Sequence, residues 1–184
     1  MIIKDGKGRG NQAGVTVNNQ LSTHSMSEKH ISYISRERAD AYTIYVTDAA
    51  PAAGEYTLYV QNNSADYFVI DRILTSCVDA NVVWLLHRVT GTAAGASVVT
   101  PVSLNLVQSK VADLTCRGGA GGVSGLSSGA VIACWGNGVA YFPQELDLTG
   151  LVIGRGSAVA IEYDAGTGSR ADITVFGNFQ SPAS

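Results

Sequence analysis

Apolar and polar residues alternate with a period of two along most of this chain, the pattern of a strand with one buried face. In residues 41–47 the alternation places Tyr42, Ile44 and Val46 on one face. Four more segments repeat the pattern, with these inward residues: Tyr56, Leu58 and Val60; Val102, Leu104 and Leu106; Val159, Ile161 and Tyr163; Ile173, Val175 and Phe179. Residues 68–77 and 82–89 are more continuously apolar, which predicts central strands covered on both faces.

Turn signals separate these segments at intervals of about 8–12 residues, a spacing typical of a sandwich or barrel. Residues 91–95 predict one such turn, and residues 118–129, with six glycines and three serines, predict a long flexible surface loop. Only residues 25–38 offer a helix, through a capping box of Ser25 and Glu28, and a strand is the open alternative there. The predicted fold class is therefore all-β, a two-layer antiparallel β-sandwich.

Charge is sparse and unevenly placed. Charged residues make up 15% of the chain against the usual ~25%, while 46% are hydrophobic, which favours a surface partly covered by something else. The net charge is −3, and residues 1–40 carry six Lys/Arg against four acids, which makes no broad basic face. The longest apolar run covers residues 82–86, too short for a membrane span. We therefore expect a soluble protein without direct nucleic-acid or membrane contact.

The three cysteines, Cys77, Cys116 and Cys134, are far apart and form no CxxC pair. An odd number without metal or redox spacing predicts free, buried thiols in a protein made in a reducing cytoplasm. The chain opens with Met-Ile-Ile followed by Lys-Asp-Gly-Lys-Gly, which does not read as a signal peptide. We therefore expect synthesis in the cytoplasm.

Two glycine patterns suggest enzymatic chemistry, and each lacks the context that the chemistry requires. Residues 8–13 match a relaxed dinucleotide fingerprint, but a strand pattern follows where a helix would have to hold the phosphate. Gly125-Leu-Ser-Ser-Gly129 matches a nucleophile elbow around Ser127, which must lie between a strand and a helix. Its flanks are a glycine-rich segment and a strand pattern, and no histidine follows His87.

The histidines and acids form no metal or catalytic pattern either. His24 and His30 are six residues apart, and His87 lies in an apolar strand, where a hydrogen-bonded core histidine is expected. Asp164 and Asp172 flank a turn without the spacing of a calcium loop. The sequence thus predicts no catalytic residue, no cofactor and no metal ion, and we do not expect an enzyme.

The chain opens with Ile3-Lys-Asp-Gly-Lys-Gly-Arg-Gly-Asn-Gln-Ala13 followed by Val15-Thr-Val-Asn-Asn-Gln-Leu21. Three later stretches are Leu58-Tyr-Val-Gln-Asn-Asn-Ser-Ala-Asp66, Thr100-Pro-Val-Ser-Leu-Asn-Leu106 and Gly154-Arg-Gly-Ser-Ala-Val-Ala-Ile161. Together these stretches resemble a family of tailed-bacteriophage virion proteins, the capsid decoration or cement proteins, which begin with a glycine-rich arm and a hairpin. The resemblance implies a jelly-roll-like β-sandwich on the outside of a phage head, often a homotrimer, with an extended N-terminal arm. It implies no catalytic residues.

Residues 1–13 are predicted to be this arm, and residues 14–184 the sandwich domain. Residues 1–13 contain three glycines and almost no apolar side chain after Ile3, so they cannot form a packed element alone. The arm residues expected to contact an acidic capsid surface are Ile2, Ile3, Lys4, Lys7 and Arg9.

The function expected from these features is that of a structural virion protein, located on the capsid exterior after synthesis in the host bacterium. It would bind the major capsid protein and stabilise the capsid. A homotrimer is expected from the resemblance, the low charge and the apolar segment 82–89. The alternative is a carbohydrate- or receptor-binding sandwich of a head or tail fibre, with some of the eight tyrosines as stacking faces.

Overall fold

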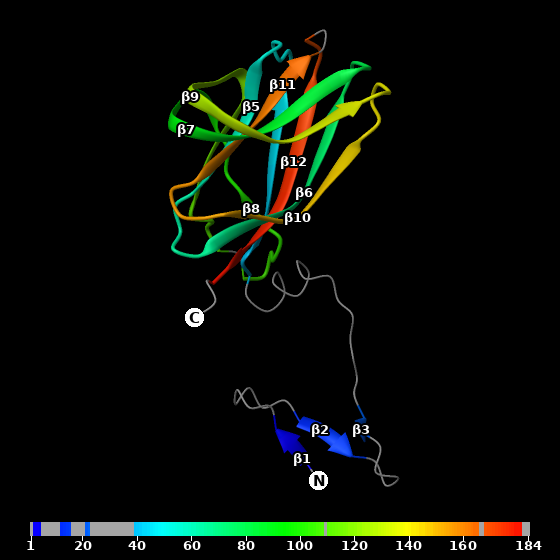
Figure 1. Ribbon diagram of the computed structural model, residues 1–184, viewed down its shortest axis with the longest axis vertical. Coiled ribbons are helices and arrows are strands. Elements are labelled where there is room, and N and C mark those ends of the chain that lie inside the picture. Colours follow the sequence, from blue (N-terminus) through cyan, green and yellow to red (C-terminus); the bar gives the residue numbers. More distant parts are fainter. Residues whose placement is uncertain are drawn as a thin grey trace.

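The computed structural model describes residues 2–4, 12–15, 21–22, 39–108, 110–165 and 168–181 (Figure 1). All regular structure within these residues is β-strand. The strands are β1 (Ile2–Lys4), β2 (Gln12–Val15), β3 (Leu21–Ser22), β4 (Ala41–Asp48), β5 (Glu55–Asn62), β6 (Tyr67–Cys77), β7 (Val82–Val98), β8 (Val102–Ser103), β9 (Leu114–Asn137), β10 (Gln144–Ile153), β11 (Ala158–Ala165) and β12 (Ala171–Gln180). Every strand pair is antiparallel, which confirms the predicted all-β class.

The strands from β4 onward form two sheets. The first sheet has the order β10-β6-β12-β4-β8, and the second contains β5, β11, β7 and β9. Along the chain, β4, β6, β10 and β12 of the first sheet are interleaved with β5, β7, β9 and β11 of the second. This interleaving is compatible with the two Greek keys of a jelly roll, and the jelly-roll topology stays a prediction.

The main core lies between the two sheets and contains most of the inward residues that the alternation predicts. Tyr42, Ile44 and Val46 of β4 are all buried in it. From the second sheet, Trp84 is fully buried and packs edge-on against Tyr163, with ring centroids 5.3 Å apart. A buried aromatic pair of this kind adds about 0.5–1.5 kcal/mol beyond the area it removes from water.

The apolar segment 82–89 is also explained by this core. Val82, Trp84 and Leu86 point into the main cluster, and Val89 belongs to a second, smaller one. Val83 and Leu85, on the opposite face, are only partly exposed, so the segment presents little free apolar surface and gives little support for a trimer. Interior packing of the chain itself accounts for its hydrophobicity.

Three predicted inward residues, Val102, Leu104 and Leu106, are exposed to solvent instead. The strand predicted through Val102, Leu104 and Leu106 shrinks to the two-residue β8, and Leu106 is 82% exposed. Beyond Ser103 the chain turns, because the Ser103 hydroxyl accepts a hydrogen bond from Asn105 N–H at 3.2 Å. A serine-stabilised turn of this kind competes locally with the strand.

The glycine-rich segment 118–129 is not the flexible loop that its composition predicts. It lies inside β9 and pairs with β7, so that residues 91–95 are strand rather than turn. Added side chains would not fit at two points of this pairing: a Cβ at Gly91 would meet the Gly125 carbonyl, and one at Gly125 would meet the Thr92 carbonyl. Glycine is required here for the close approach of two backbones.

Residues 90–98 of β7 lie beside residues 117–129 of β9. We call this part of the β7–β9 pair the distal hairpin. At its end, Arg117 pairs with Val98 of β7 and also with Tyr59 of β5. The second sheet therefore closes on itself through the order β11-β5-β9-β7. The small cluster enclosed there contains these buried residues: Tyr59, Val89, Val123, Ala158 and Ala160. Tyr56, predicted to face the main core, packs against this cluster instead, next to a β-bulge between Ile161 and Glu162.

The described N-terminal strands pair with one another. β1, β2 and β3 form a three-stranded sheet, with Ile3 opposite Ala13. The predicted boundary between residues 13 and 14 falls inside β2, and the arm itself stays a prediction. Residues 25–38, left open between helix and strand, lie outside the described residues, and the described part contains no helix that could cross a membrane.

Candidate functional site

His87 lies on β7 at the face of the second sheet that the distal hairpin covers. Its backbone is paired with Ala160 of β11 on one side and with Val131 of β9 on the other. Only 5% of the residue is exposed, and Tyr56 meets its ring edge-on at a centroid distance of 5.7 Å. The predicted core histidine is therefore confirmed as buried.

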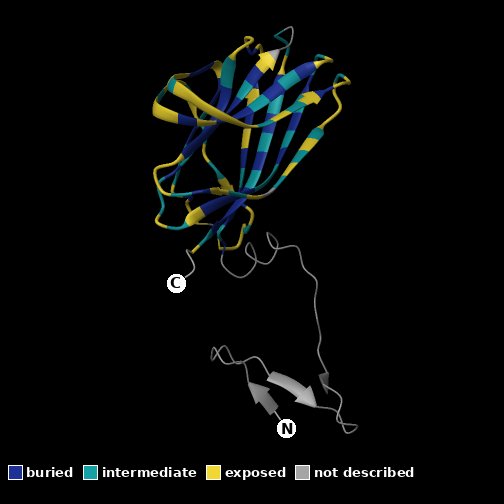
Figure 2. Cartoon of the chain, viewed as in Figure 1, coloured by how far each residue is buried: buried dark blue, intermediate teal, exposed yellow. Residues whose placement is uncertain are grey.

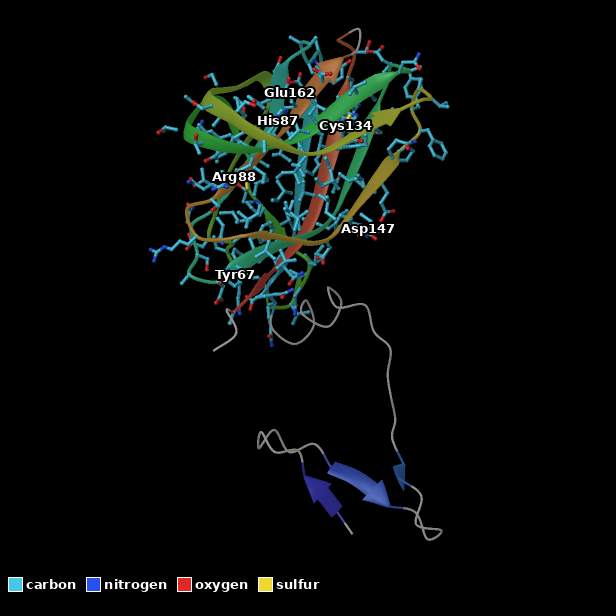
Figure 3. All side chains as sticks on the ribbon, in the orientation of Figure 1. Tyr67, His87, Arg88, Cys134, Asp147 and Glu162 are labelled. Atoms are coloured by element: carbon cyan, nitrogen blue, oxygen red, sulfur yellow. The ribbon has the colours of Figure 1, made fainter. Side chains whose placement is uncertain are left out.

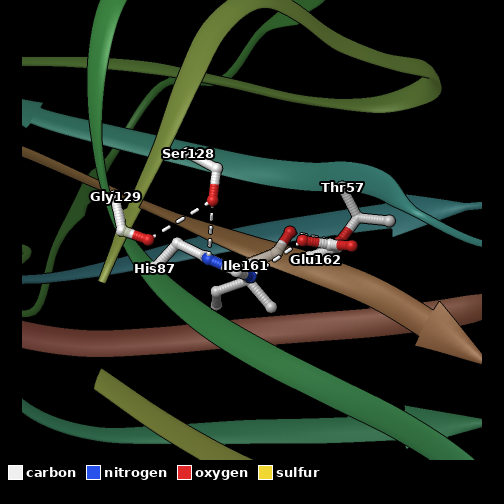
Figure 4. A network of polar contacts seen from close by, with 6 residues as sticks. All are labelled: Thr57, His87, Ser128, Gly129, Ile161 and Glu162. Atoms are coloured by element: carbon white, nitrogen blue, oxygen red, sulfur yellow. Dashed lines mark hydrogen bonds and ion pairs between the residues drawn. The ribbon is translucent and has the colours of Figure 1, made fainter. Parts of the chain in front are cut away.

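Both nitrogens of this imidazole have a polar neighbour (Figure 4). Nε2 lies 2.8 Å from Oε2 of Glu162, without the alignment of a hydrogen bond, and the two form an ion pair when the ring is protonated. Nδ1 lies 3.3 Å from Oγ of Ser128, whose hydroxyl donates to the Gly129 carbonyl at 3.4 Å. Figure 3 shows His87 and Glu162 close together on neighbouring strands, β7 and β11.

The order acid, imidazole, hydroxyl is that of a serine-hydrolase relay, but the backbone around the serine differs from that of a hydrolase. A nucleophile elbow holds its serine on a sharp turn between strand and helix. Here Ser127 and Ser128 lie within β9, opposite Thr90 and Val89 of β7. The geometry therefore fits a link that ties the distal hairpin to β7 and β11 better than it fits a nucleophile.

A second polar cluster lies where β4 ends and β5 begins. Asp48 Oδ1 accepts a hydrogen bond from Ala50 N–H at 3.0 Å, and Glu55 Oε2 accepts one from Ala52 N–H at 2.8 Å. The other oxygen of each carboxyl group is buried without such a donor. The Glu55 side chain lies directly against Gly122 of the distal hairpin, where any Cβ would collide with it.

The two carboxyl groups are close enough to affect each other. The pKa of Glu55 is raised, first by burial and further by the charge of Asp48 and a hydrogen bond with it, against the lowering effect of Ala52 N–H. The raised pKa of Glu55 favours its protonated form, and a proton there lets Glu55 donate a hydrogen bond to the buried oxygen of Asp48.

The cysteines are free, as predicted, but only two are buried. Burial raises the pKa of Cys116 to about 12, which keeps it a neutral thiol. Cys134 is exposed, which corrects the expectation for that residue. Its position on β9 follows the inward Ala133, which packs against the main core.

The structure describes only some of the arm residues that are predicted to contact a capsid. Ile2, Ile3 and Lys4 form β1, and Lys7 and Arg9 lie outside the described residues. His24 and His30 lie outside them as well. In the part of the chain that the structure describes, no three His, Cys, Asp or Glu side chains gather into a possible metal site.

Ser128, Glu162, Asp48 and Glu55 are the polar residues that sequence reasoning missed. The alternation of Val159, Ile161 and Tyr163 predicts only an outward position for Glu162, and Ser128 lies within the predicted glycine-rich loop and the elbow pattern around Ser127. Ser128 and His87 are 41 residues apart, and their contact depends on the register shifts on both sides of His87. No short motif in the sequence signals such a contact.

Comparison with known proteins gives no match to a family model, to a curated protein or to a solved structure. The resemblance to phage decoration proteins therefore stays a hypothesis that stands on the stretches of sequence alone.

The carboxyl pair predicts a pH dependence of stability. A raised folded pKa means that the folded state binds the proton more tightly than the unfolded chain, so this contribution is complete at low pH and is lost as pH rises through the raised value. Glu55→Gln, which mimics the protonated form, should raise the Tm at pH 7.5 by about 2–4 °C and change little at pH 4. Thermal melts at both values test this.

The matched control is Glu145→Gln, because Glu145 is half-exposed and makes a surface ion pair with Arg72 at 3.4 Å. That variant should leave the Tm at pH 7.5 nearly unchanged. A Glu55→Gln protein that melts lower than the parent at pH 7.5 would show that the carboxyl pair is not strained by ionisation.

Proposed function

We propose that this chain is a structural protein of a bacteriophage particle that binds the outer surface of the capsid and stabilises it. One observation carries the proposal beyond the resemblance: a set of exposed apolar side chains at one end of the sandwich. Leu106, Val107 and Val111 are 82%, 92% and 95% exposed in the connection between β8 and β9. Val102 and Leu104 next to them are also exposed. Several exposed apolar side chains in one short segment are typical of an interaction site.

The same end of the sandwich contains its first described residues, next to β8 and the connection that follows it. Asp40 forms a salt bridge with Lys110, with 2.9 Å between Oδ1 and Nζ. The Ala41 carbonyl accepts a hydrogen bond from Leu104 N–H at 2.8 Å. In Figure 2, residues at this end of the described sandwich are among those coloured as exposed. We call this surface, residues 102–108 with 110–111, the docking end.

The proximity of the docking end to the start of the sandwich supports a joint anchor. The described sandwich begins at residue 39, on the side that carries the apolar residues. Two linked contacts raise each other's effective concentration, so an arm and an apolar surface on one side bind more tightly together than either does alone. The capsid exterior and the major capsid protein are the location and the partner that this proposal implies.

A glycan- or receptor-binding sandwich is the second candidate function. It is favoured by an open groove on the first sheet, away from the docking end, whose chemistry is developed below.

The proposal includes a homotrimer, which now stands on the resemblance and the low charge content. Cyclic symmetry would present three docking ends to one capsid site and close the assembly. Light scattering of the free protein at micromolar concentration should give about three times the 19.2 kDa chain mass. A single species with the mass of one chain would refute the trimer. It would not bear on the docking end, which the next experiment tests.

The docking end predicts a loss of capsid binding without loss of fold. Leu106→Asp, Val107→Asp and Val111→Asp in one chain should leave the melting curve unchanged, because these side chains are exposed and contribute little to the core. Co-sedimentation with particles of the parent phage assembled without this protein should fall at least tenfold, because charge replaces the apolar contact.

The control carries three aspartates at other exposed apolar positions, Val131, Val139 and Phe142, so its net charge matches that of the test variant. It should sediment with the particles as the parent protein does. Full binding by the docking-end variant would refute the assigned surface. Failure of the unmodified protein to bind these particles would refute the function itself.

A further inference from the structure

The outward face of the first sheet contains an open groove of about 300 Å³. It lies over β4, β6 and β12 and ends against the connection between β9 and β10. Its lining residues are Tyr45, Leu74, Thr75, Ser76, Pro143, Asp172 and Thr174. A space of this size admits a small ligand unit rather than a protein surface.

The groove offers one aromatic ring in a fixed position. Tyr45 is 51% exposed, although its hydroxyl is held by a hydrogen bond to Asp172 Oδ1 at 2.8 Å. Arg170 donates to the same oxygen from Nε and Nη2, at 3.3 and 3.1 Å. The ring is therefore oriented before any ligand arrives, and less entropy is lost on binding.

A second ring on this face is already occupied. The Arg72 guanidinium lies over the Phe176 ring at 4.4 Å from its centroid and pairs with Glu145 at 3.4 Å. Phe176 follows Asp172 and Thr174 on the same face of β12. The available stacking surface is therefore limited to the Tyr45 end of the groove.

The polar groups of the groove favour hydroxyl donors. Burial opposes the ionisation of Asp172, but hydrogen bonds from Tyr45, Arg170 and Thr47 outweigh it and lower its pKa. Asp172 is therefore a carboxylate at neutral pH, and a charged acceptor makes the stronger hydrogen bonds. The hydroxyls of Ser76 and Thr174 lie nearby, while Leu74 and Pro143 add an apolar strip.

We propose that this groove binds a neutral pyranose unit of a glycan. The C–H face of the sugar would stack on the Tyr45 ring, and its hydroxyls would donate to Asp172 and to the nearby Ser76 and Thr174. An anionic sugar would meet the Asp172 carboxylate at close range, and the neighbouring Arg170 guanidinium is already paired with that carboxylate, so an anion is disfavoured. An apolar ligand would displace water from the polar groups of the groove without replacing its hydrogen bonds, which is also unfavourable.

The groove is independent of the docking end. The β4–β12 ladder pairs Thr47 with Asp172 near one end of the first sheet, and Ala41 with Asn178 near the other. The docking end adjoins Ala41, so the groove lies at the opposite end of these strands. A protein attached through the docking end would leave the groove open to the medium, and neither proposal requires the other.

The test is binding of the full-length protein to an array of immobilised neutral and acidic oligosaccharides, followed by titration calorimetry with the best neutral one. Saturable binding to at least one neutral glycan is expected. Tyr45→Ala and Asp172→Asn should each weaken it at least tenfold, and Tyr45→Phe, which keeps the ring, should weaken it less than Tyr45→Ala does. Thermal melts establish that each variant is folded.

The matched control is Tyr67→Ala, because Tyr67 is also an exposed tyrosine (41%) but lies at the other end of β6 (Figure 3). This substitution should leave the affinity for the glycan unchanged. Capsid co-sedimentation of Tyr45→Ala should equal that of the parent protein, which separates this result from the docking experiment. Absence of any neutral-glycan binding, binding of acidic glycans alone, or binding that folded Tyr45→Ala retains would each overturn the proposal.

Discussion

The close approach of two backbones in the distal hairpin is the constraint on which the closure of the second sheet depends. Side chains at Gly91 and Gly125 would overlap with carbonyl oxygens across the pair, and a Cβ at Gly129 would lie 2.6 Å from the Arg88 carbonyl. Because these positions lack a side chain, β9 can follow β7 over its whole length and still reach β5. The second sheet closes, and a separate apolar cluster forms inside it.

The two polar clusters depend on the same closure. The pairing of Ser128 with Val89 brings the serine to within 3.3 Å of His87, and the position of Gly122 places the hairpin backbone on Glu55. A buried polar group without a partner costs free energy, so the contacts with Ser128 and Glu162 contribute to keeping His87 in this position. These buried polar contacts thus help to hold the distal hairpin in place. The surfaces proposed for binding lie elsewhere on the molecule.

The predictability of the fold follows the regularity of its strands. β4 and β12 bury every second residue over most of their length, so their inward faces could be predicted from period two. β11 buries residues 158–161 in succession, because one face packs in the main core and the other in the small cluster. β10 was missing from the predicted strands, since a register shift between Asp147 and Leu151 interrupts its alternation. The distal hairpin was mispredicted because glycine serves both turns and close backbone contacts, and composition does not distinguish them. The polar clusters join residues from distant strands, which only the register brings together.

Hydrogen exchange of the distal hairpin amides in two glycine variants tests the central claim most directly. Gly125 and Gly121 both have a positive φ, +76° and +85°, but only a Cβ at Gly125 meets a neighbouring carbonyl, while Gly121 faces open space. Both alanine variants therefore carry the conformational cost, and Gly125→Ala alone adds the clash. We expect Gly125→Ala to accelerate exchange in residues 90–98 and 117–129 at least tenfold more than Gly121→Ala, with β6 and β12 still protected. Equal effects of the two substitutions would contradict the account.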